Sequence, residues 1–209
     1  MPWLGTVDSS HWTADFRLAR LLEYVYVKTG RRQPVVVVGL GLSLDRPGSV
    51  GPTVATELAK VYPYVFGRGG QEVARHNLEA TFFRITEEFP QSFVIVVDGT
   101  SGESEEDGHI IAWSASVEPD EEFLTARQAL GAAAAGGRRG LPSPLDERQV
   151  PRTATLGADI ATVPAQVGLI GVIGPVVGPA SAHQRRFMAT CDAIIDGILR
   201  FFYRTGQLL

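Results

Sequence analysis

The stretch of sequence that most constrains the fold runs from Pro34 to Lys60 and reads PVVVVGLGLSLDRPGSVGPTVATELAK. Its four consecutive valines, Val35–Val38, are typical of a strand that is buried on both faces. A glycine-rich loop follows, and an apolar pattern at helical spacing then predicts a helix over Pro52–Tyr62, in which Pro52 suits the first turn. Open α/β sheets form ligand sites from this succession of strand, loop and helix. We therefore expect a pocket at this loop, lined by Gly41, Ser43, Gly48, Ser49 and Gly51.

The spacing of these glycines argues against a phosphate-binding loop. Gly39 and Gly41 begin a dinucleotide fingerprint, but its third glycine is missing. The loop also lacks the Gly-Lys-Ser/Thr ending of a P-loop. The chemistry of the site must therefore come from other side chains.

A second apolar strand is predicted at Phe93–Val97, and it stops at Asp98. The helical pattern through Leu78, Phe82, Ile85 and Phe89 precedes it, with Asn77 as a candidate cap. We expect this strand to lie parallel and adjacent to Val35–Gly39 in the centre of one sheet.

The remaining elements follow from the same patterns. A helix is predicted from Thr13 to Gly30, a brief strand at Val65–Gly67 and a strand within 108–116. Residues 157–178 suit one or two short strands, and a long helix spans Ser181–Tyr203 with an apolar face through Met188, Cys191, Ile195, Ile198 and Phe202. Residues 1–10 are expected to be irregular. Helices before, between and after parallel strands predict an α/β protein with three α/β/α layers and a mostly parallel central sheet.

The chain is interpreted as a single domain over residues 1–209, because 209 residues with 44% hydrophobic content can bury a full core. A short helix is expected within 118–130. The composition then changes at 131–151, where GAAAAGGRRGLPSPLDERQVP predicts a mobile surface loop. The alternative is that the alanines extend the preceding helix.

Composition also limits the partners. A net charge of −4 argues against nucleic acid, and the longest apolar stretch is interrupted by glycines and prolines, which argues against a membrane span. The single cysteine, Cys191, excludes an internal disulfide and is expected to be buried. With no basic and apolar leader at residue 1, the expected location is the cytoplasm. A protein or peptide ligand and a homodimer both stay open.

Several of these segments together resemble the YyaC-type sporulation proteins. They are the strand VVVVGLG, the loop ending GSVGP, the helix TVATELAK, the strand FVIVVDGTSG and, later, VGLIGVIGPVV. That family is similar to the spore germination protease and, more remotely, to the hydrogenase maturation endopeptidases. The resemblance covers about residues 34–202 and implies a phosphorylase/hydrolase-like fold, a role in sporulation and a location in the sporulating cell or forespore.

The resemblance implies two acidic residues that face each other above the sheet and hold a divalent metal or share a proton, and so activate water. Asp98 matches the second acid, and it is the metal ligand that we expect here. Gly48 stands where the first acid belongs. A family histidine is also displaced: Ala74 occupies its position, and His76 follows two residues later. Apart from this divalent metal, the sequence indicates no cofactor.

Each candidate residue also has an ordinary structural interpretation. Asp98 is either a site acid at a strand end or a turn residue before Gly99. Asp45 either replaces the missing acid or is an ordinary loop residue that pairs with Arg46 or accepts a hydrogen bond from its own backbone. His76 is either a base or a neighbour of a helix cap. Ser49 fits a cap better than a nucleophile. His109 and His183 are expected at the surface or at loop edges.

Two functions follow. The first is a peptidase that uses Asp98 with Asp45 or His76. The second, favoured by Gly48 and Ala74, is a catalytically degenerate relative that keeps the scaffold and acts as a binding or structural protein during sporulation.

Overall fold

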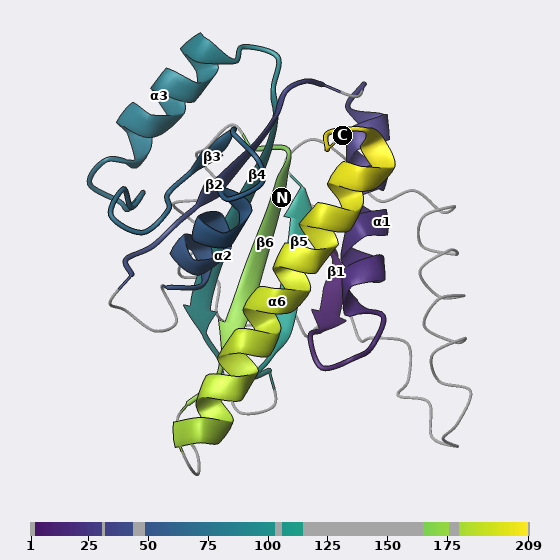
Figure 1. Ribbon diagram of the computed structural model, residues 1–209, viewed down its shortest axis with the longest axis vertical. Coiled ribbons are helices and arrows are strands. Elements are labelled where there is room, and N and C mark those ends of the chain that lie inside the picture. Colours follow the sequence, from purple (N-terminus) through teal and green to yellow (C-terminus); the bar gives the residue numbers. More distant parts are fainter. Residues whose placement is uncertain are drawn as a thin grey trace.

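The computed structural model describes residues 3–30, 32–43, 49–102, 106–114, 165–175 and 180–208. These residues form a six-stranded sheet with helices on both faces (Figure 1). The strands are β1 (Trp3–Asp8), β2 (Val35–Gly39), β3 (Val65–Phe66), β4 (Phe93–Ser101), β5 (His109–Ser114) and β6 (Val167–Ile173). The helices are α1 (Ala14–Lys28), α2 (Val50–Leu58), α3 (Leu78–Glu88) and α6 (Ala180–Thr205).

The strand order across the sheet is β1-β5-β6-β4-β2-β3. β3, β2, β4 and β6 run parallel to one another, whereas β5 is antiparallel to both β6 and β1. The expected centre of the sheet is confirmed: β2 and β4 pair in parallel from Val35 opposite Phe93 to Gly39 opposite Val97. All five residues of β2 are buried, as the run of valines predicted.

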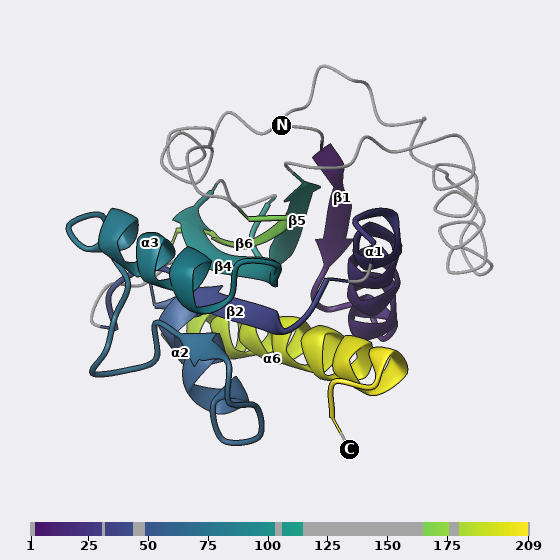
Figure 2. The ribbon, with the colours of Figure 1, turned by 90° about the horizontal axis from the view of Figure 1, so that it is seen from above.

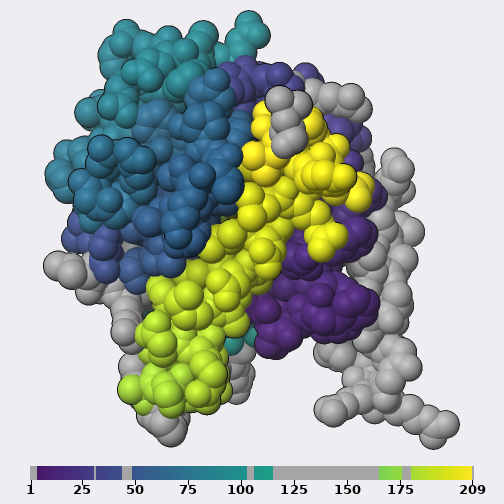
Figure 3. Space-filling model, viewed as in Figure 1, coloured from purple at the N-terminus to yellow at the C-terminus, as the bar shows by residue number. Residues whose placement is uncertain are grey.

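The sheet separates two apolar layers, and side chains alternate between them along each strand. Val35, Val37, Ile95 and Val97 pack with α1, α2 and α6, while Val36, Val38, Val94 and Val96 pack with α3. Figure 2 shows α3 on one side of the sheet and α2 and α6 on the other. In the space-filling view, α6 crosses the molecule between α2 and α1 (Figure 3). The predicted three-layer α/β architecture is therefore confirmed.

Two expectations for the strands were wrong. Residues 1–10 are not an irregular lead-in, because Trp3–Asp8 forms edge strand β1 and buries Leu4 and Val7. The register shifts between Trp3 and Gly5, and the buried Leu4 and Val7 are three residues apart, so the strand shows no regular alternation of apolar side chains. The second correction concerns β4, which runs on to Ser101 instead of stopping at Val97. Pairing with β6 from Ile95 to Ser101 provides backbone partners beyond the end of β2.

The buried face of α6 lies partly to one side of the predicted one. Cys191, Ile198 and Phe202 are buried as expected, but Met188 is 39% exposed and Ile195 is only partly buried. Phe187, Ile194 and Phe201 are also buried, and so is His183, whose expected place at the surface was wrong. Because α6 packs against both α1 and α2, its contact stripe is wider than one row.

The other helices agree with the sequence patterns except at their ends. α2 begins at Val50 and stops at Leu58, short of the expected Tyr62; Pro63 disfavours helical geometry in the residue before it. Thr13 and Asn77 lie at N-cap positions, yet neither makes a capping side-chain hydrogen bond. Gly30 follows α1 with a φ of +84°, the left-handed geometry that ends helices.

Some expectations fall outside the described residues: the helix within 118–130, the loop at 131–151 and the part of 157–178 that precedes residue 165. Among the helices of the described ranges, none is long and apolar enough to cross a membrane.

Candidate functional site

The candidate site lies where the carboxyl ends of β2 and β4 meet the start of α2. Gly39 and Gly51 allow this contact, because a Cβ on Gly39 would collide with the Gly51 carbonyl, and one on Gly51 would lie 2.7 Å from the Val97 oxygen. Gly67, with a φ of +81°, would collide with the Gly39 carbonyl in the same way. These glycines are therefore required by the close approach of backbone segments. They bring the first turn of α2 directly onto the strand ends.

Asp98 is the first residue of β4 beyond its pairing with β2. Gly39 opposite Val97 is the last pair, and the Leu40 N–H then donates to the Val97 carbonyl at 2.7 Å. On the other side Asp98 pairs with Ile170 of β6. By alternation from Val94 and Val96, its side chain lies on the α3 face of the sheet. The residue is therefore inside a strand, where β2 has already ended.

The Asp98 carboxyl is buried, with only 6% of the residue exposed. Its Oδ1 accepts a hydrogen bond from the Gly99 backbone N–H at 2.7 Å. Burial raises the pKa of Asp98 from 3.8 to about 6, and the Gly99 N–H opposes this shift. No charged side chain of the described residues contributes to the shift, so the cause is loss of water and not a neighbouring charge.

The segment that carries the displaced histidine runs alongside the end of β2. Leu40 and Val73 form a parallel bridge, and the Gly41 N–H donates to the Val73 carbonyl at 2.9 Å. Ala74 follows immediately, so the family's histidine position adjoins the site. His76 is exposed in the turn before α3, and no described hydrogen bond or ion pair joins it to Asp98.

Asn77 explains the shape of this turn, and its interactions correct the expectation of a cap. Its Oδ1 accepts from the Ala74 N–H at 2.8 Å, and its Nδ2 donates to the Glu72 carbonyl at 3.0 Å. The side chain therefore closes the turn at 72–77 and does not cap α3. This turn holds Ala74 beside β2 and directs His76 outward.

A second set of contacts ties the glycine loop to the turn after β3. Ser43 Oγ donates to Glu72 Oε1 at 2.6 Å, and the Gly70 N–H donates to the same oxygen at 3.1 Å. The hydrogen bond from Ser43 is the main reason that the pKa of Glu72 lies below its usual value. Thr56 of α2 accepts from the Gly69 N–H at 2.9 Å. Loop, turn and helix are thus joined at the surface.

A shallow pocket of about 240 Å³ lies beside these contacts. Its lining residues are Ser43, Pro52, Thr53, Thr56 and Glu57. Of the described loop residues that were expected to line a pocket, the lining includes Ser43 alone, and it does not include Asp98. The buried acid and the open pocket are therefore separate features.

The structure brings only some of the predicted residues together. Asp98, Gly41 and Gly51 lie at the strand ends, and Ser49 occupies the N-cap position of α2 without a capping side-chain bond. Asp45 and Gly48 fall outside the described residues. In the ranges that are described, no three His, Cys, Asp or Glu side chains form a group that could hold a metal ion.

Two contributors were missed from the sequence. They are Glu72, which accepts the hydrogen bond from Ser43, and Thr56, which accepts the one from Gly69. Their partners lie 29 and 13 residues away, so no local pattern marks them.

The fold and the strand-end acid define an α/β protein with a glycine-built site at the carboxyl ends of parallel strands. Comparison with protein families makes this specific. The family model described as "Protein of unknown function (DUF1256)" matches residues 7–134, and the chain belongs to this family, which includes the YyaC-type proteins. Among curated proteins, none matches the chain.

Proposed function

We propose that this chain is a catalytically degenerate relative of the germination proteases that acts in sporulation by binding a protein or peptide. The observation that carries the proposal is the isolation of Asp98. Its carboxyl is buried and accepts a hydrogen bond from Gly99, and no second acid or histidine of the described residues is joined to it. A peptidase of the implied kind needs a second acidic pole to hold a metal or share a proton.

The two other polar positions of the family support the same conclusion. Gly48 replaces the loop acid. Ala74 lies next to the bridge between Leu40 and Val73, beside the strand end, and has no ionisable group. His76 is exposed in the following turn. The scaffold around the site is nevertheless kept, with Gly39, Gly51 and Gly67 in close backbone contact, which favours a retained binding role.

If a divalent ion does bind, Asp98 is the described residue that would contribute a carboxylate oxygen. One carboxylate is a poor site, because dedicated sites supply three or four protein ligands. We therefore expect weak binding of zinc or manganese by the unchanged protein in calorimetric titration.

The decisive comparison uses Gly48→Asp with Gly48→Asn as its matched control. Only the aspartate adds a charge, so we expect Gly48→Asp alone to raise metal affinity, by roughly tenfold or more. Adding Asp98→Ala to Gly48→Asp should remove the gain. Tight binding by the unchanged protein that Asp98→Ala abolishes would contradict the proposal, because another residue must then complete the site.

The alternative function is an active peptidase in which Asp98 works with Asp45 or His76. The observation in its favour is the pKa of Asp98 at about 6, which lies near the range in which a carboxyl group can exchange protons at neutral pH. A peptide-cleavage screen separates the two functions. Cleavage that is lost in Asp98→Asn establishes the peptidase, whereas peptide binding without cleavage supports the degenerate site.

A link to sporulation needs its own measurement. The protein level should rise when cells that carry it enter sporulation and stay low in growing cells. A constant level through both stages would contradict this part of the proposal.

A further inference from the structure

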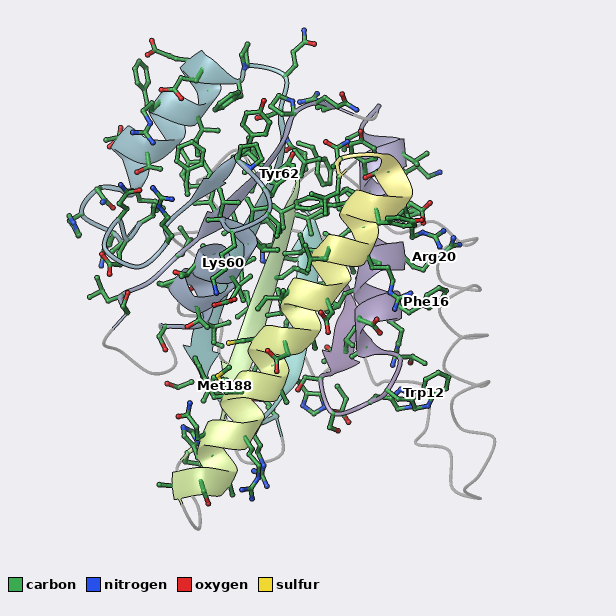
Figure 4. All side chains as sticks on the ribbon, viewed as in Figure 1. Trp12, Phe16, Arg20, Lys60, Tyr62 and Met188 are labelled. Atoms are coloured by element: carbon green, nitrogen blue, oxygen red, sulfur yellow. The ribbon has the colours of Figure 1, made fainter. Side chains whose placement is uncertain are left out.

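The outer side of α1, the helix that packs against α6 and β1, forms a second surface of interest. The inner side of this helix is fully packed, with Leu18, Leu22 and Val25 at 0% exposure. Phe16, Arg20, Glu23 and Val27 lie on the opposite side of the helix by their spacing, and we call these four residues the α1 stripe. Figure 4 shows Phe16 and Arg20 following one another along the same side of the helix, with Trp12 below them.

The stripe exposes apolar surface that the described fold does not use. Val27 is 48% exposed, Phe16 is half-buried, and Trp12, just before the helix, is 84% exposed. Single exposed apolar residues are ordinary, but here they recur along one helical face. Between them lie one basic and one acidic residue, Arg20 and Glu23. The pattern is apolar, basic, acidic, apolar.

This pattern is self-complementary. The four positions are separated by four, three and four residues, the spacing of a coiled-coil seam. When two such helices pack antiparallel about a two-fold axis, Phe16 faces Val27 of the second copy, and Arg20 faces Glu23 of the second copy. Each contact then occurs twice, as an isologous interface requires. We propose that the α1 stripe binds a second copy of this chain in this antiparallel arrangement.

The charges on α1 favour the antiparallel arrangement of the two copies over a parallel one. A parallel pairing in register would place Arg20 against Arg20 and Glu23 against Glu23, which repel. Within the chain, Arg20 meets Glu23 only at 3.5 Å, and its side chain is 50% exposed. Arg204 of α6 holds Glu23 at 2.9 Å and so fixes the carboxylate at the edge of the stripe. Arg20 of the second copy can approach the same carboxylate from outside.

The stripe is one helix long, which sets the strength of the interaction. A helix of 15 residues spans about 22 Å, and an interface of this size belongs to the weak class. We expect a dimer with a dissociation constant in the range of about 1–100 μM. Sedimentation of the full chain over a concentration series measures this equilibrium directly.

The first test is Val27→Glu, with Phe83→Glu as its matched control. Phe83 is 64% exposed on α3, on the other side of the sheet, so both variants place a carboxylate at an exposed apolar position. Val27→Glu should weaken the dimer by about tenfold or more, because it buries an unpaired charge at the seam. Phe83→Glu should leave the dimer unchanged. A protein that is monomeric at about 100 μM, or a dimer that Val27→Glu does not weaken, overturns the proposal.

The second test identifies the pairing itself. Arg20→Glu and Glu23→Arg should each weaken self-association, because each brings like charges together across the axis. Mixing the two variants should restore association, since every contact between positions 20 and 23 is then between opposite charges. Glu23→Arg also removes the pair with Arg204, so its circular dichroism spectrum is compared with that of the unchanged protein. Failure of the mixture to associate, with both variants folded, rejects the antiparallel arrangement.

Discussion

At the scale of single residues, Asp98 is the side chain whose chemistry departs most from its surroundings. It continues an apolar strand, yet it is an acid with 6% exposure. Burial is the main influence on its pKa, and among the described residues the Gly99 backbone N–H donates a hydrogen bond to its carboxyl group. A buried acid of this kind reduces the stability of the folded state whenever it is ionised, which gives it a measurable signature.

We predict that Asp98→Asn stabilises the protein at neutral pH and removes part of its pH dependence. The folded-state pKa, about 6, lies above the ordinary value of 3.8, so the folded state binds the proton more tightly than the unfolded chain does. Stability from this group is therefore greatest below pH 4 and falls as the pH rises towards 6. The gain from Asp98→Asn at pH 7 is at most about 3 kcal/mol, and about 1–2 kcal/mol is expected because the new amide also needs partners.

Urea unfolding at several pH values between 4 and 8 checks this prediction. Asp8→Asn is a suitable control: burial raises the pKa of Asp8, but the hydrogen bonds that Ser10 donates to its carboxylate outweigh burial, so the net shift is downward and its effect on stability has the opposite sign. Equal pH slopes for the unchanged protein and Asp98→Asn would mean that the carboxyl is solvated in solution.

At the scale of elements, the site is built by backbone contacts and not by side chains. β2, the start of α2 and the turn after β3 meet through Gly39, Gly51 and Gly67. Such contacts require a missing Cβ, so glycine at these positions has a steric reason. The glycines of the loop were visible in the sequence, but their partners, such as Gly67 against Gly39, were not, because they come from a different strand.

We predict that Gly51→Ala destabilises the fold more than Gly206→Ala does. A Cβ at Gly51 would collide with the Leu40 carbonyl and lie 2.7 Å from the Val97 oxygen, both of them backbone atoms that cannot rotate away. The loss should be about 2–3 kcal/mol or more. Gly206 has a φ of +71° and open space around it, so its substitution should cost only about 1 kcal/mol of backbone strain. Similar unfolding midpoints for the two variants would show that α2 can shift away from the strand ends.

At the scale of the whole molecule, the central strands of the sheet could be predicted from the sequence, but the edge strand β1 and the full length of β4 could not. The runs Val35–Val38 and Phe93–Val97 carry their own signal, since a strand buried on both faces is apolar throughout. β1 has no such signal, because its buried residues Leu4 and Val7 are three apart and share one apolar cluster across a register shift between Trp3 and Gly5. The same apolar run locates Asp98 directly after Val97, beyond the last pair with β2, but the extension of β4 to Ser101 depends on β6, about 70 residues later in the chain.

The last prediction tests whether the first residues belong to the core. Leu4 is 0% exposed and lies in the same apolar cluster as α1 and α6. Leu4→Ala should therefore lower the free energy of unfolding by about 2–4 kcal/mol, the usual effect of a buried cavity. Tyr203→Ala, at a residue 81% exposed near the other end of the chain, should change it by less than about 0.5 kcal/mol. Urea unfolding of both variants measures the difference. If Leu4→Ala behaves like Tyr203→Ala, β1 is only loosely attached, and the sheet ends at β5.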